Sequence, residues 1–249
     1  EYTPPQTTYG IGNFGGGLCE GGGQITLQRA FEVSCNTTFA RLGVHLGAEK
    51  LVSQAEGFGL NADWEFDLPI ATSRIPEPAE IDPPAAAQSA IGQRDVQVTP
   101  LQMAMIAGTV ANDGVLLRPR LIDRVQTFSG RTVREFRPQT MVLPGADDAD
   151  VLSPRVAATL RQMMVGVVER GSGGNAAISG VQVAGKTGTA QTAEGVDPTV
   201  WFVGFAPADD PRVAVAVVVP NGGDEGSEAT GGVVAAPIAK AVIEAVLQE

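Results

Sequence analysis

Apolar residues in the first half of the chain recur at helical spacing, and residues that favour helix starts precede them. Thr26 is placed to cap a short helix that ends before Ser34, and a second helical pattern follows directly. A third pattern covers residues 48–55 and stops at a glycine-containing turn. These short helices predict a mainly helical subdomain, which we place at about residues 25–115.

Two stretches of this half lack a clear period. Residues 1–24 are rich in Gly, Thr and Pro, which predicts irregular chain or a ragged strand. Residues 64–88 combine proline, alanine and acidic residues, which predicts a long surface segment with little regular structure.

A further helix is expected to start after Thr99, where a capping box coincides with proline at the first helical position. The helix should run to about Ala111. Its predicted core-facing residues are Met103, Ile106, Ala107 and Val110.

The period changes to two along much of the second half, about residues 116–249, which predicts strands. The expected elements are a hairpin over 121–128 and 132–136, a helix from Ser153, strands at 181–184 and onward, 201–205 and 213–219, and a helix over about 235–247. The strand at 213–219 is apolar on both faces, which indicates a central strand covered by helices on each side.

The composition limits the possible functions. The 249 residues are 43% hydrophobic, enough for one large domain or two modest ones. The formal net charge of −11 argues against a nucleic acid or an anionic membrane as partner. No apolar run approaches the roughly 20 residues that span a bilayer, and the N-terminus lacks a signal-peptide pattern. We therefore expect any targeting or anchoring segment to lie outside this chain.

Cys19 and Cys35 stand 16 residues apart. Two thiols cannot form a tetrahedral zinc site alone, and His45 is too distant for a familiar ligand pattern, so we expect no metal and no cofactor. A disulfide is the sharper interpretation, with two free buried thiols as the alternative. A disulfide would imply an oxidising compartment and roughly 3 kcal/mol of stabilisation.

Residues 180–191, GVQVAGKTGTAQ, fit two unrelated motifs. The glycine at 180 and G-K-T at 185–187 match a phosphate-binding loop, whereas K-T-G is a signature of penicillin-reactive serine acyltransferases. A phosphate loop needs a polar or glycine-rich turn and a helix that starts at the lysine. Here the residues before Lys186 alternate as in a strand, and those after it form no apolar helical face. We therefore interpret the stretch as a K-T-G strand.

A second short motif, Ser34-Cys35-Asn36, lies at a predicted helix end. Together S-C-N and K-T-G-T resemble the second and third motifs of penicillin-binding proteins and serine β-lactamases. The resemblance covers most of the chain and is closest to the division- and shape-associated class B penicillin-binding proteins of actinobacteria. The segments that carry it are SAIGQRDVQVTPLQMAMIAGTVANDGVLLRP, KTGTAQ, WFVGFAP and TGGVVAAPIAKAVIEAVL. It implies an α/β fold of layered α+β type, in which helices cover an antiparallel sheet beside an all-helical subdomain, here truncated at its N-terminus.

The resemblance implies acyl transfer. A serine would attack the D-Ala-D-Ala amide of a peptidoglycan stem peptide, D-alanine would leave, and an amine of a second stem peptide would take the acyl group. Lys186 would supply positive potential, Ser34 would pass a proton to the departing nitrogen, and Asn36 would fix the substrate amide. Singly, Ser34 and Asn36 would be helix caps and Lys186 a solvated charge; their combination and order favour the catalytic interpretation.

The same resemblance assigns the rest of the K-T-G-T run to substrate binding. The hydroxyls of Thr187 and Thr189 suit the terminal carboxylate, and Gly188 lets the peptide lie along the strand. The backbone N–H of Thr189 would be one oxyanion donor. We expect His45 to be a surface or packing residue, and Trp201 and Phe202 to belong first to the core.

The first motif of the family, S-x-x-K, is not found. The residues three positions before Lys50, Lys186 and Lys240 are glycine, valine and proline. Three explanations compete: a truncated or proteolysed fragment, a structure in two chains, or a natural pseudoenzyme. The apolar strand at 213–219 favours the first two, because without a neighbouring strand it would expose a long apolar edge. We therefore expect a transpeptidase parent protein and an inactive isolated chain.

The implied partners are peptidoglycan stem peptides, β-lactams, the remaining N-terminal part of the same protein and proteins of cell division or elongation. The implied location is the extracytoplasmic face of the membrane, with the parent anchored by a transmembrane helix absent here. The alternative is a module that binds peptidoglycan or a division complex without chemistry.

Overall fold

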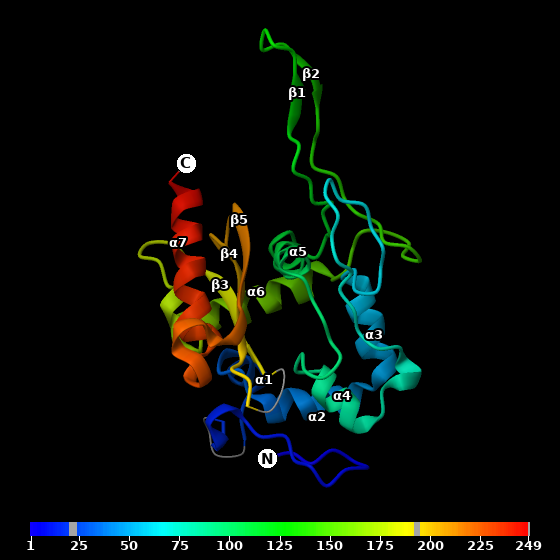
Figure 1. The fold of residues 1–249 in the computed structure, drawn as a ribbon, viewed down its shortest axis with the longest axis vertical. Coiled ribbons are helices and arrows are strands. Elements are labelled where there is room, and N and C mark those ends of the chain that lie inside the picture. Colours follow the sequence, from blue (N-terminus) through cyan, green and yellow to red (C-terminus); the bar gives the residue numbers. More distant parts are fainter. Residues whose placement is uncertain (20–23, 192–194, 249) are drawn as a thin grey trace.

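The computed structural model describes residues 1–19, 24–191 and 195–248. The helices are α1 (Leu27–Glu32), α2 (Asn36–Leu46), α3 (Ala48–Gly57), α4 (Pro83–Ser89), α5 (Pro100–Ala111), α6 (Pro154–Arg170) and α7 (Ala236–Leu247). The strands are β1 (Arg124–Gln126), β2 (Thr132–Glu135), β3 (Ala184–Ala190), β4 (Thr199–Ala206) and β5 (Val213–Val219). Helices α2 to α4 lie in a lobe beside the sheet, with α5 between that lobe and the strands, and α1 packs against α6 close to the sheet (Figure 1).

Side-chain caps begin three helices at the residues predicted from the sequence. The hydroxyls of Thr26, Thr99 and Ser153 accept hydrogen bonds from backbone N–H groups three residues on, at 3.1, 3.1 and 3.4 Å. The capping box expected at α5 is only half formed. The Thr99 N–H, which would donate to Gln102 in a complete box, donates instead to Ser73 Oγ at 3.0 Å, and the buried Gln102 side chain donates to the carbonyl oxygen of Phe58 at 2.6 Å.

The inward face of α5 differs in detail from the predicted one, and the apolar residues of α6 are not all buried. Met103 and Ile106 of α5 are only half-buried, while Met105 on the same helix is buried. Val156 in the first turn of α6 is exposed, and the buried residues of α6 begin at Ala157. Helical period alone therefore located the helices better than their buried faces.

The end of the proline- and alanine-rich stretch is a buried helix, so the prediction of an irregular surface segment was wrong for α4. Asp82 caps this helix by accepting from the N–H of Ala85 at 2.8 Å, and a proline follows the cap. The three successive alanines of α4 are buried. A side chain at Gly43 of α2 would collide with Ala90, so small residues on both sides permit the close approach of α2 and α4.

An antiparallel sheet of three strands in the order β3-β4-β5 forms the other layer. Helix α7 packs on one face, α5 packs on the other, and α6 packs against β3 (Figure 1). Strand β5 is therefore covered on both faces, as predicted. Within the described residues it is an edge strand and β4 is central, and the neighbouring strand expected from the rest of the parent protein stays a prediction.

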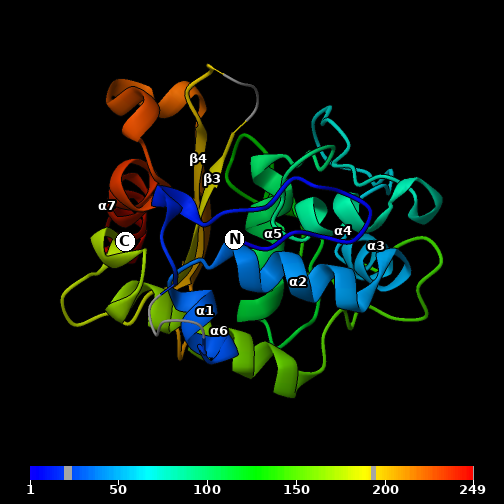
Figure 2. The same ribbon diagram turned by 90° about the horizontal axis from the view of Figure 1, so that it is seen from below.

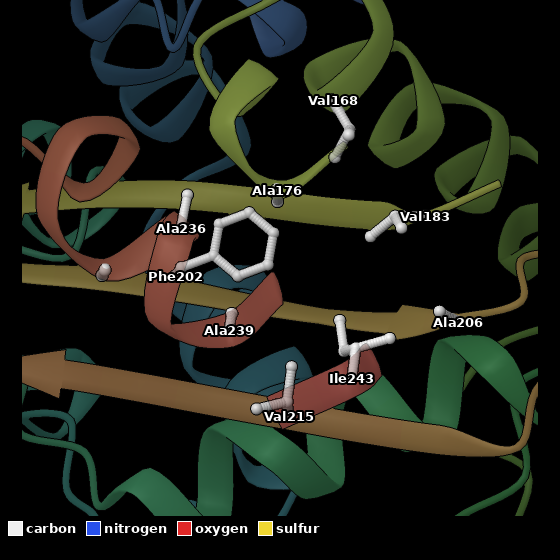
Figure 3. Packing of buried hydrophobic residues seen from close by; sticks show 10 residues of the cluster. Val168, Ala176, Val183, Phe202, Ala206, Val215, Ala236, Ala239 and Ile243 are labelled. Carbon is white, nitrogen blue, oxygen red and sulfur yellow. The ribbon is translucent and has the colours of Figure 1, made fainter. Parts of the chain in front are cut away.

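The apolar core under α7 is organised around Phe202 of β4, which is fully buried. Its ring lies against Ala236 and Ala239 of α7 (Figure 3). A side chain at Gly185 of β3 would collide with this ring, so the glycine before Lys186 lets the core aromatic pass beneath the strand. The contact between Gly185 and the Phe202 ring therefore sets the distance between β3 and the core.

The β1–β2 hairpin projects away from the rest of the molecule (Figure 1). All of its strand residues are exposed, and Phe128 in the connecting turn is fully exposed. Among the described helices, none is by itself long and apolar enough to cross a membrane. The helical segments 220–228 and 231–247 together reach the required length and apolar composition, but they are bent by 115° relative to each other.

Candidate active site

Ser34 occupies the tight link between α1 and α2. Its φ of 57° lies in the left-handed region, where a non-glycine residue costs of order 1 kcal/mol. The turn is held by the Ser34 N–H, which donates to the carbonyl of Phe31 at 3.2 Å, and by the Cys35 N–H, which donates to that of Ala30 at 2.8 Å. A disulfide joins Cys35 to Cys19, the pairing expected from the sequence. The Ser34 hydroxyl is thereby presented from a constrained turn.

Lys186 reaches Ser34 across 152 residues of sequence. Its ammonium donates to Ser34 Oγ at 2.7 Å and to the carbonyl oxygen of Thr187 at 2.7 Å. The same nitrogen lies 5.7 Å from the centre of the Phe31 ring. Burial disfavours the charged form and lowers the pKa of Lys186 from 10.5 to about 8. The lysine is therefore a concentrated, poorly hydrated positive charge next to a hydroxyl.

Ser34 lines a cleft of about 610 Å³, whereas Lys186 is not among the residues that line it. The residues predicted to contact substrate all line it: Ser34, Asn36, Thr187, Gly188 and Thr189. Thr187 and Thr189 stand two residues apart on β3, so their side chains lie on one face of the strand. Strand β3 continues through Lys186 and no helix begins there, which agrees with rejecting a phosphate-binding loop.

The N-terminal segment lines part of this cleft and is hydrogen-bonded to the start of α2. Asn36 Nδ2 donates to the carbonyl of Gly12 at 3.3 Å, and Asn13 Oδ1 accepts from the N–H of Thr37 at 3.0 Å. Figure 2 shows this segment beside α2. The sequence indicated irregular chain here and contained no signal that it would line the site.

Both threonine hydroxyls of the K-T-G-T run already have partners. Thr187 Oγ1 lies 2.5 Å from Ser172 Oγ, and Thr189 Oγ1 accepts from the N–H of Gly231 at 3.4 Å. Ser172 and Gly231 both line the cleft and were missed from the sequence, as was Gln93.

The carboxylate of Glu32, at the end of α1, is buried with only 2% of its surface exposed. It accepts from Arg170 at 2.6 Å, from Gln28 at 3.0 Å and from Arg29 at 3.1 Å. Burial alone would raise the pKa of Glu32, but these donors outweigh burial and lower it below 4.5. The ion cluster ties the end of α1, two residues before Ser34, to the end of α6.

Other residues singled out in the sequence lie outside the cleft lining. His45 is exposed in the last turn of α2, Trp201 is half-buried on β4, and Phe202 is in the core. Gly188 also serves packing, because a Cβ there would stand 3.2 Å from Cβ of Trp201. In the part of the chain that the structure describes, no group of three or more His, Cys, Asp or Glu side chains could hold a metal ion.

Strand β3 thus brings Lys186 to Ser34 of the helical part, and its two threonines, Thr187 and Thr189, line the cleft that Ser34 also lines. Residues 3–244 match the penicillin binding protein transpeptidase domain, and the chain belongs to this family.

Relatives of known name agree with this assignment. The chain is 42% identical to the peptidoglycan D,D-transpeptidase PbpA of Mycolicibacterium smegmatis, over 98% of this chain and 48% of the relative. It is 43% identical to PbpA of Mycobacterium tuberculosis, with the same two coverages. The solved structure of penicillin-binding protein A from M. tuberculosis, as a ceftriaxone acyl-enzyme complex, matches with a TM-score of 0.89 at 39% identity, covering 99% of this chain and 54% of that one. These matches confirm the expected fold. The chain spans about half the length of the relatives it matches.

Proposed function

We propose that this chain is the C-terminal part of the transpeptidase domain of a peptidoglycan D,D-transpeptidase, with the division into subdomains expected from the sequence. The parent protein would cross-link stem peptides through D-Ala-D-Ala and be acylated by β-lactams. The single observation that carries the proposal is the 2.7 Å hydrogen bond from Lys186 Nζ to Ser34 Oγ at the cleft. The names of the relatives and the acyl-enzyme complex of the matched structure support it.

The proposed chemistry divides between the helical lobe and the strand. Ser34, held between the ammonium and the cleft, relays a proton: its hydroxyl hydrogen goes to the leaving nitrogen, and its oxygen takes a proton in turn from the Lys186 ammonium that donates to it. Asn36 orients the substrate amide from the start of α2, exchanging its present bond to the Gly12 carbonyl for the substrate. Lys186 stabilises negative charge without direct attack.

Substrate binding is proposed for β3. The hydroxyls of Thr187 and Thr189 face the terminal carboxylate, and Gly188 leaves room for a peptide that lies along the strand. The N–H of Thr189 is proposed as one oxyanion donor. Because β3 is an edge strand among the described residues, its outer side is free to pair with an extended peptide.

The nucleophile and its base are proposed to come from the rest of the parent protein, since no S-x-x-K occurs in this sequence. The chain alone is then inactive. The Cys19–Cys35 disulfide supports an extracytoplasmic location, because disulfides persist in oxidising compartments. We propose that the parent is membrane-anchored and acts in wall synthesis with proteins of cell division or elongation.

Intact-mass spectrometry of the full-length parent after incubation with a labelled penicillin tests this proposal. We expect a single penicilloyl adduct on the parent and none on this chain alone. Binding of stem peptides without any adduct on the parent would instead favour the non-catalytic module.

A further inference from the structure

Ser172 follows the last residue of α6 by two positions, and its hydroxyl lies 2.5 Å from that of Thr187. The side chain is half-buried and lines the cleft. We propose that Ser172 is a positioning residue that orients the Thr187 hydroxyl as a donor, and so sets the preference of the site for a carboxylate. This inference rests on the proposed function and names a determinant of its substrate class.

The Ser172–Thr187 pair can offer a ligand only the hydroxyl hydrogen that the bond between them does not use. A carboxylate only accepts hydrogen bonds, so each hydroxyl that binds it must donate. Ser172 and Thr187 carry one hydroxyl hydrogen each, and one of the two is used in the bond between them. When Ser172 donates to Thr187, the hydrogen of Thr187 is left for the ligand. Without Ser172, the Thr187 hydroxyl loses the partner that directs it.

The second threonine completes a pair of donors. Thr189 Oγ1 accepts from the Gly231 N–H at 3.4 Å, which leaves its own hydrogen to donate. Thr187 and Thr189 lie on the same face of β3 and line the same cleft. The site thus offers two oriented donors for the two oxygens of a carboxylate, whereas a neutral ester gains less from each.

The backbone around Ser172 is fixed by the buried Glu32 cluster. The Ser172 N–H donates to the carbonyl of Glu32 at 3.0 Å, and Arg29 Nη1 donates to the carbonyl of Arg170 at 2.7 Å. A side chain at Gly171 would collide with the Glu32 carbonyl, so the turn admits only a residue without Cβ there. Because Ser34 follows Glu32 by two residues, one junction positions both the proton-carrying and the carboxylate-orienting hydroxyls.

The test compares benzylpenicillin with its methyl ester as acylating probes of the full-length parent protein. In Ser172→Ala we expect the acylation rate with the acid to fall roughly tenfold, the usual size for a lost bond to a charged group. The rate with the ester should change less than about twofold, because a neutral acceptor gains little from orientation. Ser172→Thr keeps the hydroxyl and should restore most of the rate with the acid.

Ser129→Ala is the matched control, since Ser129 also pairs with a threonine hydroxyl, Thr127, at 3.0 Å but in the distant hairpin. It should leave both rates unchanged. Equal losses with acid and ester in Ser172→Ala, or no loss with either, would overturn the role proposed for Ser172 and leave the proposed function unaffected. A wild-type parent that forms no adduct with either probe would overturn the proposed function and this inference with it.

Discussion

The β1–β2 hairpin and the junction of α1, α6 and β3 differ in how far along the chain their contacts reach. In the hairpin, side-chain hydrogen bonds such as Thr127 to Ser129 join residues one to six positions apart. In the junction, Arg170 meets Glu32 and Lys186 meets Ser34 over 138 and 152 positions. The hairpin can form from local pattern, whereas the junction exists only when the two halves of the chain have packed.

The largest difference in the free energy of unfolding is expected between aromatic truncations in the two regions. Phe202 is fully buried beside β3, so Phe202→Ala should lower the free energy of unfolding by about 3–5 kcal/mol. Phe128→Ala, at the exposed turn of the hairpin, should change it by less than about 0.5 kcal/mol. Urea denaturation of both variants measures the difference. Similar losses in both would contradict the account of where the core lies.

The buried carboxylate provides a second contrast. Glu32→Gln should cost about 1–3 kcal/mol, because Arg29 and Arg170 lose the negative charge and one of the two acceptor oxygens at a site that is 2% exposed. Glu135→Gln, on an exposed strand of the hairpin, should have almost no effect and serves as control. Thermal unfolding at pH 7 measures both, and an unchanged midpoint for Glu32→Gln would remove the proposed anchor.

The same carboxylate should make stability depend on acid. Its pKa is lowered from 4.5 in the folded state, so its stabilising contribution is fully present above pH 4.5. That contribution is lost as the pH falls through the lower folded-state pKa. The wild-type midpoint should therefore drop more steeply than that of Glu32→Gln below pH 4.5, and parallel curves would refute the assignment.

A smaller effect is expected from the titration of Lys186. Its pKa of about 8 means that the ammonium loses its proton as the pH rises through that value, whereas an exposed lysine stays charged. The acylation rate of the full-length parent should then fall above pH 8, by up to about tenfold per pH unit. The exposed Lys50→Met variant should keep this profile. A rate that stays constant well above pH 8 would show that the charge is not required.

The fold was predictable where local rules decide it. Thr26, Thr99 and Ser153 cap helices through bonds to their own next turn, which a sequence pattern can show. Helix α4 was missed because its buried alanines form no strong apolar stripe and its burial depends on Gly43 of a separate helix.

The site was predictable only through the family motifs. Ser34 and Lys186 belong to recognisable short runs, but helical and strand periods alone would not have brought them together. Glu32 and Ser172 belong to no such run, and their roles arise from contacts with residues that packing brings near. Long-range geometry of this kind is set by the core around Phe202 and by glycines such as Gly171.

A double-mutant cycle on the full-length parent tests the central claim most directly. The acylation rate with penicillin would be measured in the wild type, Ser34→Ala, Lys186→Met and the double variant. If Lys186 acts through Ser34 across their 2.7 Å bond, each single change should cost roughly a hundredfold, and the double variant should be little slower than the slower single one. Losses that simply multiply in the double variant would contradict a coupled pair.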